Sequence, residues 1–64
     1  MPFYENLCKL KAERGESNYR LAKALGVTQT SVANWCSGKF LPLPIYVEKL
    51  AEHYGVTVEE LRRP

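Results

Sequence analysis

Apolar residues recur along this chain at intervals of three and four positions, the spacing that places them on one side of an α-helix. The pattern predicts five short helices, at residues 4–14, 17–25, 28–37, 44–54 and 57–62, and contains no strand-like alternation. Helices this short are marginal alone in water, so they must share a core. We expect that core to contain Leu7, Leu10, Leu21, Ala22, Leu25, Val27, Val32, Trp35, Val47, Leu50, Ala51, Tyr54, Val56 and Leu61.

Polar residues mark the starts of these helices. Ser17 and Thr28 stand where an N-cap is needed, and Thr57 with Glu60 forms the pattern of a capping box. Pro44 suits the first position of the fourth helix, because proline lacks the backbone N–H that is unpaired there anyway. Glycines follow the first four helices, as left-handed C-terminal residues do. We therefore expect a compact all-α fold in a single domain, residues 1–64.

The third predicted helix has two unlike faces. At about 100° per residue, Ser31, Val32 and Trp35 fall toward the core. The opposite face carries small, uncharged groups suited to base edges in the major groove of DNA: Gln29, Thr30, Ala33 and Asn34. An ordinary solvated helix face would also contain such residues. The preceding short helix and the tight turn at Gly26 favour DNA reading, because two short helices joined in this way form a helix-turn-helix.

Composition and charge agree with a small globular protein. The chain has 64 residues and is 45% hydrophobic, which suits one modest core. Residues 1–39 hold six basic and three acidic side chains, whereas residues 40–64 hold three basic and four acidic ones. This mild basic excess near the polar-faced helix suits a polyanionic partner. No run of about 18 apolar residues is present, so we expect a cytoplasmic protein without a membrane span.

The sequence gives little support to catalysis or metal binding. His53 is the only histidine, and no nucleophile, carboxylate pair or phosphate-binding loop accompanies it. Cys8 and Cys36 match no zinc-binding spacing, and we expect reduced thiols on or beside the core. We predict no enzyme activity, no metal and no cofactor.

The pattern S-N-Y-R-L-A-x-x-L-G-V-T-Q-T-S-V-x-x-W-x-x-G-K at residues 17–39 is followed by Pro42, by Leu50 with Ala51, and by G-V-T-V-E-E-L at residues 55–61. In this combination the chain resembles the lambda repressor and Cro family, also called the XRE type, of bacterial and phage helix-turn-helix regulators. The resemblance implies a compact five-helix domain in which residues 17–25 position the recognition helix, Gln29 to Ser37. It implies a dimeric transcriptional regulator, here expected to be a repressor at the nucleoid.

The resemblance also assigns contacts. Gln29 and Thr30 would be the leading base readers and Asn34 a third, with Ala33 allowing close approach. Phosphate contacts would come from Ser17, Asn18, Thr28, Ser37 and Lys39, with Thr28 more a cap than a contact.

The chain departs from the family pattern in two ways. Many relatives form an ion pair between a basic residue late in the first helix and a glutamate near the end of the third. Here these positions are Lys11 and Cys36, so we expect Cys36 to fill the core and Lys11 to snorkel or face DNA. Glu16 replaces a usually apolar residue and would repel phosphate unless turned away.

The main alternative is a protein-interaction module. Phe40, Leu41, Leu43 and Ile45 form an apolar run around the start of the fourth helix. Half of these side chains could seal the core. The family commonly dimerises near this region, so we expect a homodimer on double-stranded DNA through residues 40–45 or the fifth helix. The same surface could instead bind a different protein, as in an antitoxin or antagonist. The chain could also be the DNA-binding head of a longer regulator, with Arg62, Arg63 and Pro64 beginning a linker.

Overall fold

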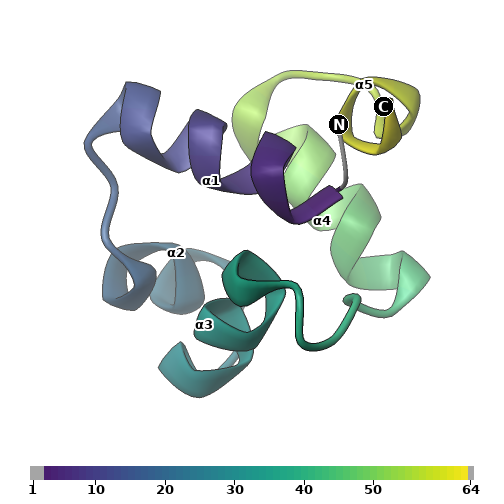
Figure 1. Ribbon diagram of the computed structural model, residues 1–64. Coiled ribbons are helices and arrows are strands. Elements are labelled where there is room, and N and C mark those ends of the chain that lie inside the picture. The colour runs from purple at the N-terminus through teal and green to yellow at the C-terminus, as the bar shows by residue number, and fades with distance from the viewer. Residues whose placement is uncertain (1–2, 64) are drawn as a thin grey trace.

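The computed structural model describes residues 3–63, which form five helices and no strand. They are α1 (Phe3–Arg14), α2 (Asn18–Leu25), α3 (Gln29–Ser37), α4 (Pro44–Tyr54) and α5 (Val58–Arg62). In Figure 1, α2 and α3 lie together on one side, α4 and α5 lie on the other, and α1 crosses above α3. The predicted all-α, five-helix fold is confirmed, while Pro64, expected in a linker, lies outside the described residues.

The polar residues predicted to start helices act as N-caps. The side-chain oxygens of Ser17 and Thr28 each accept a hydrogen bond, at 3.1 Å, from the backbone N–H three residues later. Thr57 and Glu60 form the predicted capping box. Because the caps stand outside the helices, α2, α3 and α5 each begin one residue later than the expected bounds. Pro44 is the first residue of α4.

At one position glycine is required for two reasons: the backbone is left-handed there, and a neighbouring side chain leaves no space for a Cβ atom. Gly38 ends α3 with φ +80°, a left-handed conformation that other residues adopt at a cost. A Cβ atom added there would lie 2.8 Å from Cδ1 of Tyr4 on α1. The absence of a side chain at Gly38 therefore lets the end of α3 pack directly on α1.

The core draws on all five helices. Eleven predicted members are buried: Leu7, Leu21, Ala22, Leu25, Val32, Trp35, Val47, Leu50, Ala51, Tyr54 and Leu61. The other three, Leu10, Val27 and Val56, are half-buried and pack against this cluster. Trp35 stacks at a tilt beside Tyr46, with ring centroids 5.8 Å apart. Its position ties α3 to the start of α4. Within residues 3–63, every helix is too short or too polar to cross a bilayer.

Candidate nucleic-acid interface

The two faces of α3 differ as the periodicity predicted. Val32 is fully buried and Trp35 is only 6% exposed, which fixes the helix to the core. On the opposite side the side chains of Gln29, Thr30 and Ala33 are exposed, and Asn34 is half-exposed. Ser31, expected on the core side, is half-buried beside Thr28, with the two hydroxyl oxygens 2.9 Å apart. An uncharged face with amide, hydroxyl and methyl groups is thus available to a partner.

The turn before α3 is held by backbone hydrogen bonds. Gly26 has φ +74°, and its N–H bonds to the carbonyl of Ala22 at the end of α2. The N–H of Val27 bonds to the same carbonyl at 3.0 Å. These bonds satisfy groups that a helix end otherwise leaves unpaired. They also set the direction in which the chain enters α3, so α2 and α3 form one packed unit.

The residues predicted to contact phosphate lie around this unit in different local settings. Ser17 and Thr28 are exposed, but their oxygens are already used as N-caps. Ser37 donates a hydrogen bond to the carbonyl of Asn34 at 3.1 Å. The exposed Lys39 places its ammonium 5.6 Å from the ring centroid of Phe40. Among the predicted phosphate ligands, Lys39 is thus the one with an exposed, charged end.

Asn18 has a partner that sequence reasoning did not foresee. Its Oδ1 accepts a hydrogen bond from the ammonium of Lys11, which reaches from α1 to the first residue of α2. The same ammonium lies 3.4 Å from Sγ of Cys36 near the end of α3. Lys11 therefore links three helices. Cys36 is half-buried and packs against the core cluster, so the prediction that it is fully buried is wrong, whereas the expected place beside the core is confirmed. Its sulfur faces the lysine at the edge of the core.

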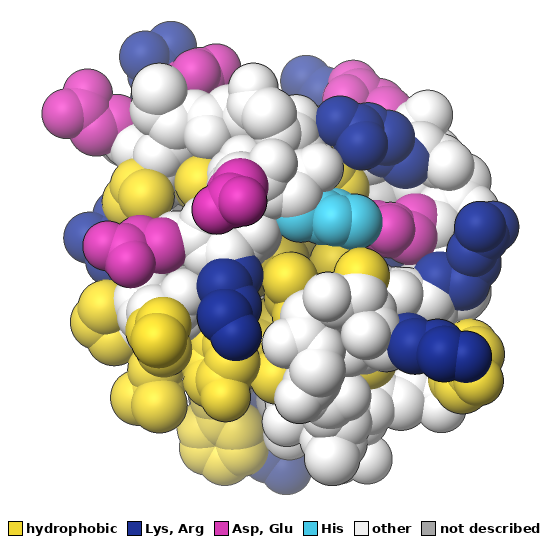
Figure 2. Space-filling model, turned by 180° about the vertical axis from the view of Figure 1, so that it is seen from behind, with side chains coloured by type: hydrophobic (Ala, Val, Ile, Leu, Met, Phe, Trp, Pro, Cys, Tyr) yellow, Lys and Arg dark blue, Asp and Glu magenta, His cyan; other side chains and the backbone are white. Residues whose placement is uncertain are grey.

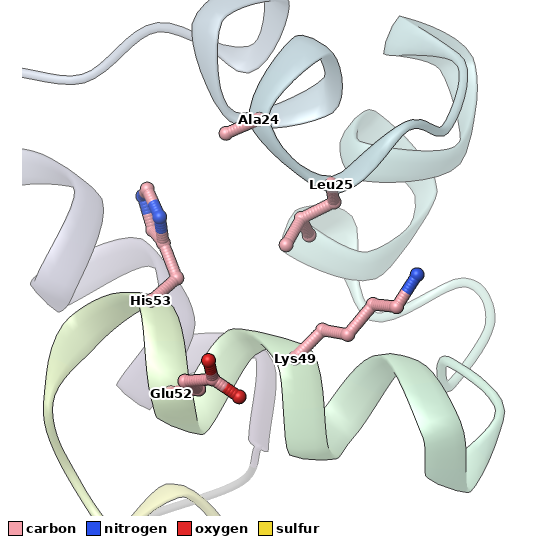
Figure 3. A pocket seen from close by; sticks show the side chains of 5 residues that line it. All are labelled: Ala24, Leu25, Lys49, Glu52 and His53. Carbon is pink, nitrogen blue, oxygen red and sulfur yellow. The ribbon is translucent and has the colours of Figure 1, made fainter.

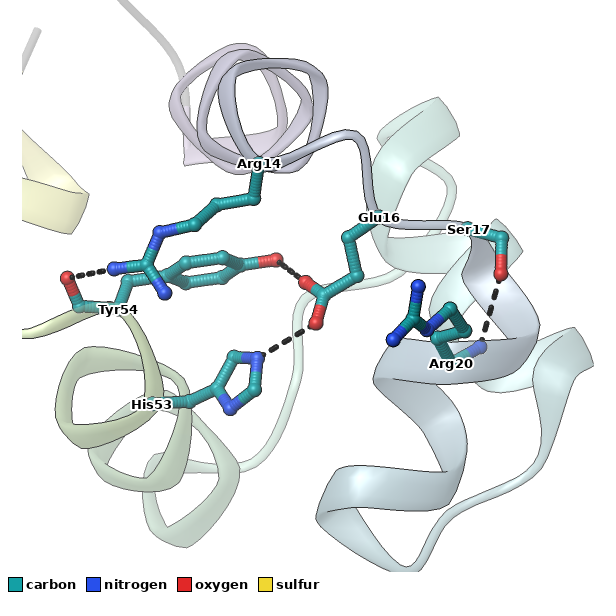
Figure 4. Close-up of polar contacts among 6 residues, drawn as sticks. All are labelled: Arg14, Glu16, Ser17, Arg20, His53 and Tyr54. Carbon is teal, nitrogen blue, oxygen red and sulfur yellow. Dashed lines mark hydrogen bonds and ion pairs between the residues drawn. The ribbon is translucent and has the colours of Figure 1, made fainter.

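Glu16 is turned away from α3 and toward α4 (Figure 4). Its carboxylate accepts a hydrogen bond from the Tyr54 hydroxyl at 2.6 Å and pairs with Nε2 of His53 at 2.8 Å. Arg14 completes the cluster, because its guanidinium donates to the carbonyl of Tyr54 at 3.0 Å and lies 5.3 Å from the centroid of its ring. The segment between α1 and α2 is thereby anchored to α4. Glu16 therefore has the turned-away orientation that we expected it to need in order not to repel phosphate.

The protonation of this cluster follows from its contacts. Burial acts to raise the pKa of Glu16, but hydrogen bonds from Tyr54 and His53 outweigh it and leave the pKa below its ordinary value. Burial, followed by the bond to Glu16, raises the pKa of Tyr54. The tyrosine is therefore the proton donor and Glu16 the charged acceptor at neutral pH.

A family model for helix-turn-helix proteins matches residues 9–61, which is most of the chain. The chain belongs to the helix-turn-helix family. Among solved structures, a transcriptional regulator from Listeria innocua is similar, with 35% sequence identity and a TM-score of 0.90. The match covers 94% of this chain and 56% of that regulator, so the chain spans about half of its length. A comparison with curated proteins found no sequence match. The family and this neighbour support a DNA-binding regulator.

The helix-turn-helix unit has a cleft behind it, between α2 and α4 (Figure 3). It has a volume of about 390 Å³ and is lined by Ala24, Leu25, Lys49, Glu52 and His53. Within residues 3–63, no group of three or more histidine, cysteine or acidic side chains could hold a metal ion.

Exposed hydrophobic side chains gather where α3 connects to α4. Phe40, Leu41, Leu43 and Ile45 are each between 56% and 77% exposed, so the alternative in which half of this run seals the core does not hold. The buried residue of the segment is Pro42. Figure 2 shows hydrophobic side chains gathered over the side of the molecule where α4 begins. We call these four exposed side chains the apolar surface of residues 40–45.

Proposed function

We propose that this protein binds specific sequences of double-stranded DNA by placing α3 in the major groove, and that it thereby represses transcription at the nucleoid. The observation that carries the proposal is the exposed, uncharged face of α3, opposite a face held by Val32 and Trp35. Gln29 and Asn34 can pair with adenine, Thr30 can meet a polar edge, and Ala33 permits close approach or contact with a thymine methyl.

Phosphates flank such a groove, and the residues around α3 offer ligands for both sides. At the start of α2 these are Ser17, Asn18 and unpaired backbone N–H groups, and Thr28 contributes mainly as a cap. At the far end of α3 they are Ser37 and the ammonium of Lys39. These contacts would set the position of the helix on the duplex, whereas α3 would select the sequence.

A homodimer accounts for the apolar surface of residues 40–45. Equivalent recognition helices in such dimers lie about 34 Å apart, one turn of DNA. The Cα extents of this domain are 25 × 23 × 22 Å, so two copies in contact have the right scale for that spacing. Burial of Leu41 and Leu43 between copies would remove the two most exposed large hydrophobic side chains from water. Sedimentation of the wild type and of Leu41→Ser tests this, since the variant should shift toward monomer.

The DNA-reading proposal is tested by selecting bound genomic fragments and then measuring affinity for the selected duplex. Gln29→Ala should lose about 1–3 kcal/mol on that duplex and relax the preference at one base. Lys39→Ala should weaken binding to all duplexes alike and reduce the slope against salt concentration by about one unit. Glu48→Ala, an exposed change on α4, is the control and should bind like wild type. An equal loss on every sequence in Gln29→Ala would rule out base reading by this residue.

A protein-interaction module of the antitoxin or antagonist kind is the second candidate, favoured by the same exposed side chains at residues 40–45. If the folded protein binds no duplex even at low salt, this function replaces the first. Repression itself is tested with a reporter gene placed behind the selected site, whose expression should fall when the protein is supplied.

A further inference from the structure

The two cysteines of the chain meet at the contact between α1 and α3. Sγ of Cys8 donates a hydrogen bond to the backbone carbonyl of Cys36 at 3.2 Å. Both side chains are half-buried, so a small reagent can reach them. Burial raises the pKa of the Cys8 thiol, and the neighbouring Cys36 thiol adds to this effect, as expected for adjacent sulfurs. We expected both thiols to be reduced, and the sequence did not predict that they meet, because 27 residues separate them along the chain.

Cys36 also contacts the residue that supports the start of α2. The ammonium of Lys11 lies 3.4 Å from Sγ of Cys36 and hydrogen-bonds to Oδ1 of Asn18. Asn18 is the first residue of α2, at the end proposed to face phosphate. Any reaction at Cys36 therefore changes the surroundings of a lysine that joins α1, α2 and α3.

We propose that Cys8 and Cys36 form a thiol-modification site, which a low-molecular-weight disulfide converts to an intramolecular disulfide between α1 and α3, and that this oxidation weakens DNA binding. The second part rests on the proposed function. The sulfur of Cys36 attacks the small disulfide and releases one small thiol, giving a mixed disulfide. Cys8 then attacks the Cys36 sulfur and releases the second. Overall, two protein thiols are oxidised to one disulfide, and one small disulfide is reduced to two small thiols. These small thiols carry away the two protons that the cysteines lose.

Oxidation affects the DNA-binding unit because forming the disulfide changes the contacts around Cys36. A disulfide requires a sulfur–sulfur distance of about 2.05 Å, so the Cys36 sulfur bonds to Cys8 and is no longer the free thiol that the Lys11 ammonium contacts at 3.4 Å. Lys11 then loses one of its two partners, and its hold on Asn18 changes. The bond also links the end of α3 covalently to α1, so the two helices can no longer adjust independently. If α2 or α3 is displaced relative to the duplex, affinity falls, because the contacts with phosphates and bases form together only when both helices are in place.

The chemical part is tested on the whole chain with glutathione disulfide as the probe. The folded wild type should end with no free thiol and a mass lower by two hydrogen atoms. Cys8→Ser should instead retain a stable glutathione adduct on Cys36, and Cys8→Ala serves if the serine variant does not fold. A persistent adduct on the wild type, or reaction only after unfolding, overturns the proposal.

The functional part is tested on the selected duplex with oxidised and reduced protein. Oxidation should weaken binding about tenfold, the effect of losing one hydrogen bond to a charged group. The reduced double variant Cys8→Ser with Cys36→Ser should not respond to the probe. Lys11→Met should bind weakly when reduced and lose little more on oxidation, because the same contact is already absent. Equal affinity of oxidised and reduced wild type refutes the coupling. If the reduced protein binds no duplex, the proposed function fails while the thiol chemistry is still measured.

Discussion

Tyr54→Phe isolates one hydrogen bond of the cluster that joins the α1–α2 segment to α4. The substitution removes only the hydroxyl that donates to Glu16 at 2.6 Å. The ring keeps its edge contact with His53, at 4.9 Å between centroids, and its stacking with Arg14. Hydrogen bonds to charged groups contribute about 1.5–3 kcal/mol to stability. Because the side chain of Glu16 is 14% exposed and water can replace part of the bond, we expect the lower end of that range.

The cost of Tyr54→Phe depends on pH with a defined sign. The pKa of Glu16 is lower in the folded protein than its ordinary value of 4.5, so the charged carboxylate stabilises the folded state. This stabilisation is fully present above pH 4.5 and is lost as the pH falls through the lowered folded value. The cost of removing the hydroxyl should therefore be constant from pH 7 to pH 5 and become smaller in more acidic solution.

Urea unfolding, monitored by circular dichroism at several pH values, measures both the cost of Tyr54→Phe and its dependence on pH. Tyr46→Phe is the matched control, since Tyr46 is a half-buried tyrosine packed on Trp35 whose hydroxyl makes no hydrogen bond within residues 3–63. It should change stability by less than about 0.5 kcal/mol. In a Glu16→Gln background, Tyr54→Phe should cost less than in wild type. A cost in Tyr54→Phe equal to that of the control at pH 7, or one that grows as the solution is acidified, would refute the assigned bond.

Substitutions at four further positions test the framework of the domain. Trp35→Ala should cost about 3–5 kcal/mol, enough to unfold much of a 64-residue domain, as seen by loss of helical circular dichroism. Gly26→Ala should cost about 1–2 kcal/mol from its left-handed backbone alone, and Gly38→Ala should cost more in the same thermal melts, because its new Cβ also meets Tyr4. Thr28→Ala should cost about 1 kcal/mol by removing the cap of α3, and Thr28→Ser should restore most of it.

The fold was predictable because its signals are local. A cap such as Thr57 with Glu60 needs only residues three positions apart, and the buried side of α3 follows from the spacing of Val32 and Trp35. Such periodicity reports which side of a helix meets the core. The sequence also showed the apolar run at residues 40–45. It could not show how exposed the run is, because that depends on how many of these side chains the core can accommodate.

Side-chain contacts between different helices have no comparable local pattern in the sequence. Glu16 and Tyr54 are 38 positions apart, and nothing in either neighbourhood shows that the hydroxyl and the carboxylate meet. Tyr54 was correctly predicted to be a core residue, and its ring is buried. Its hydroxyl group, however, donates a hydrogen bond to Glu16, which the sequence did not predict. Lys11 and Cys36 were compared only with the family's ion pair. Their actual partners depend on packing between α1, α2 and α3.

The two departures from the family pattern, at the Lys11 and Cys36 pair and at Glu16, act on the same element. Lys11 holds the first residue of α2 from α1, while Glu16, two positions before that residue, is held from α4 by Tyr54 and His53. The start of α2 is thus fixed from both sides by polar contacts rather than by one internal ion pair. Those contacts respond to different conditions, because one involves a thiol and the other a carboxylate of lowered pKa. If α2 positions α3 on DNA, mild oxidation and acidification should alter affinity independently, and a Glu16→Gln protein should keep its response to glutathione disulfide.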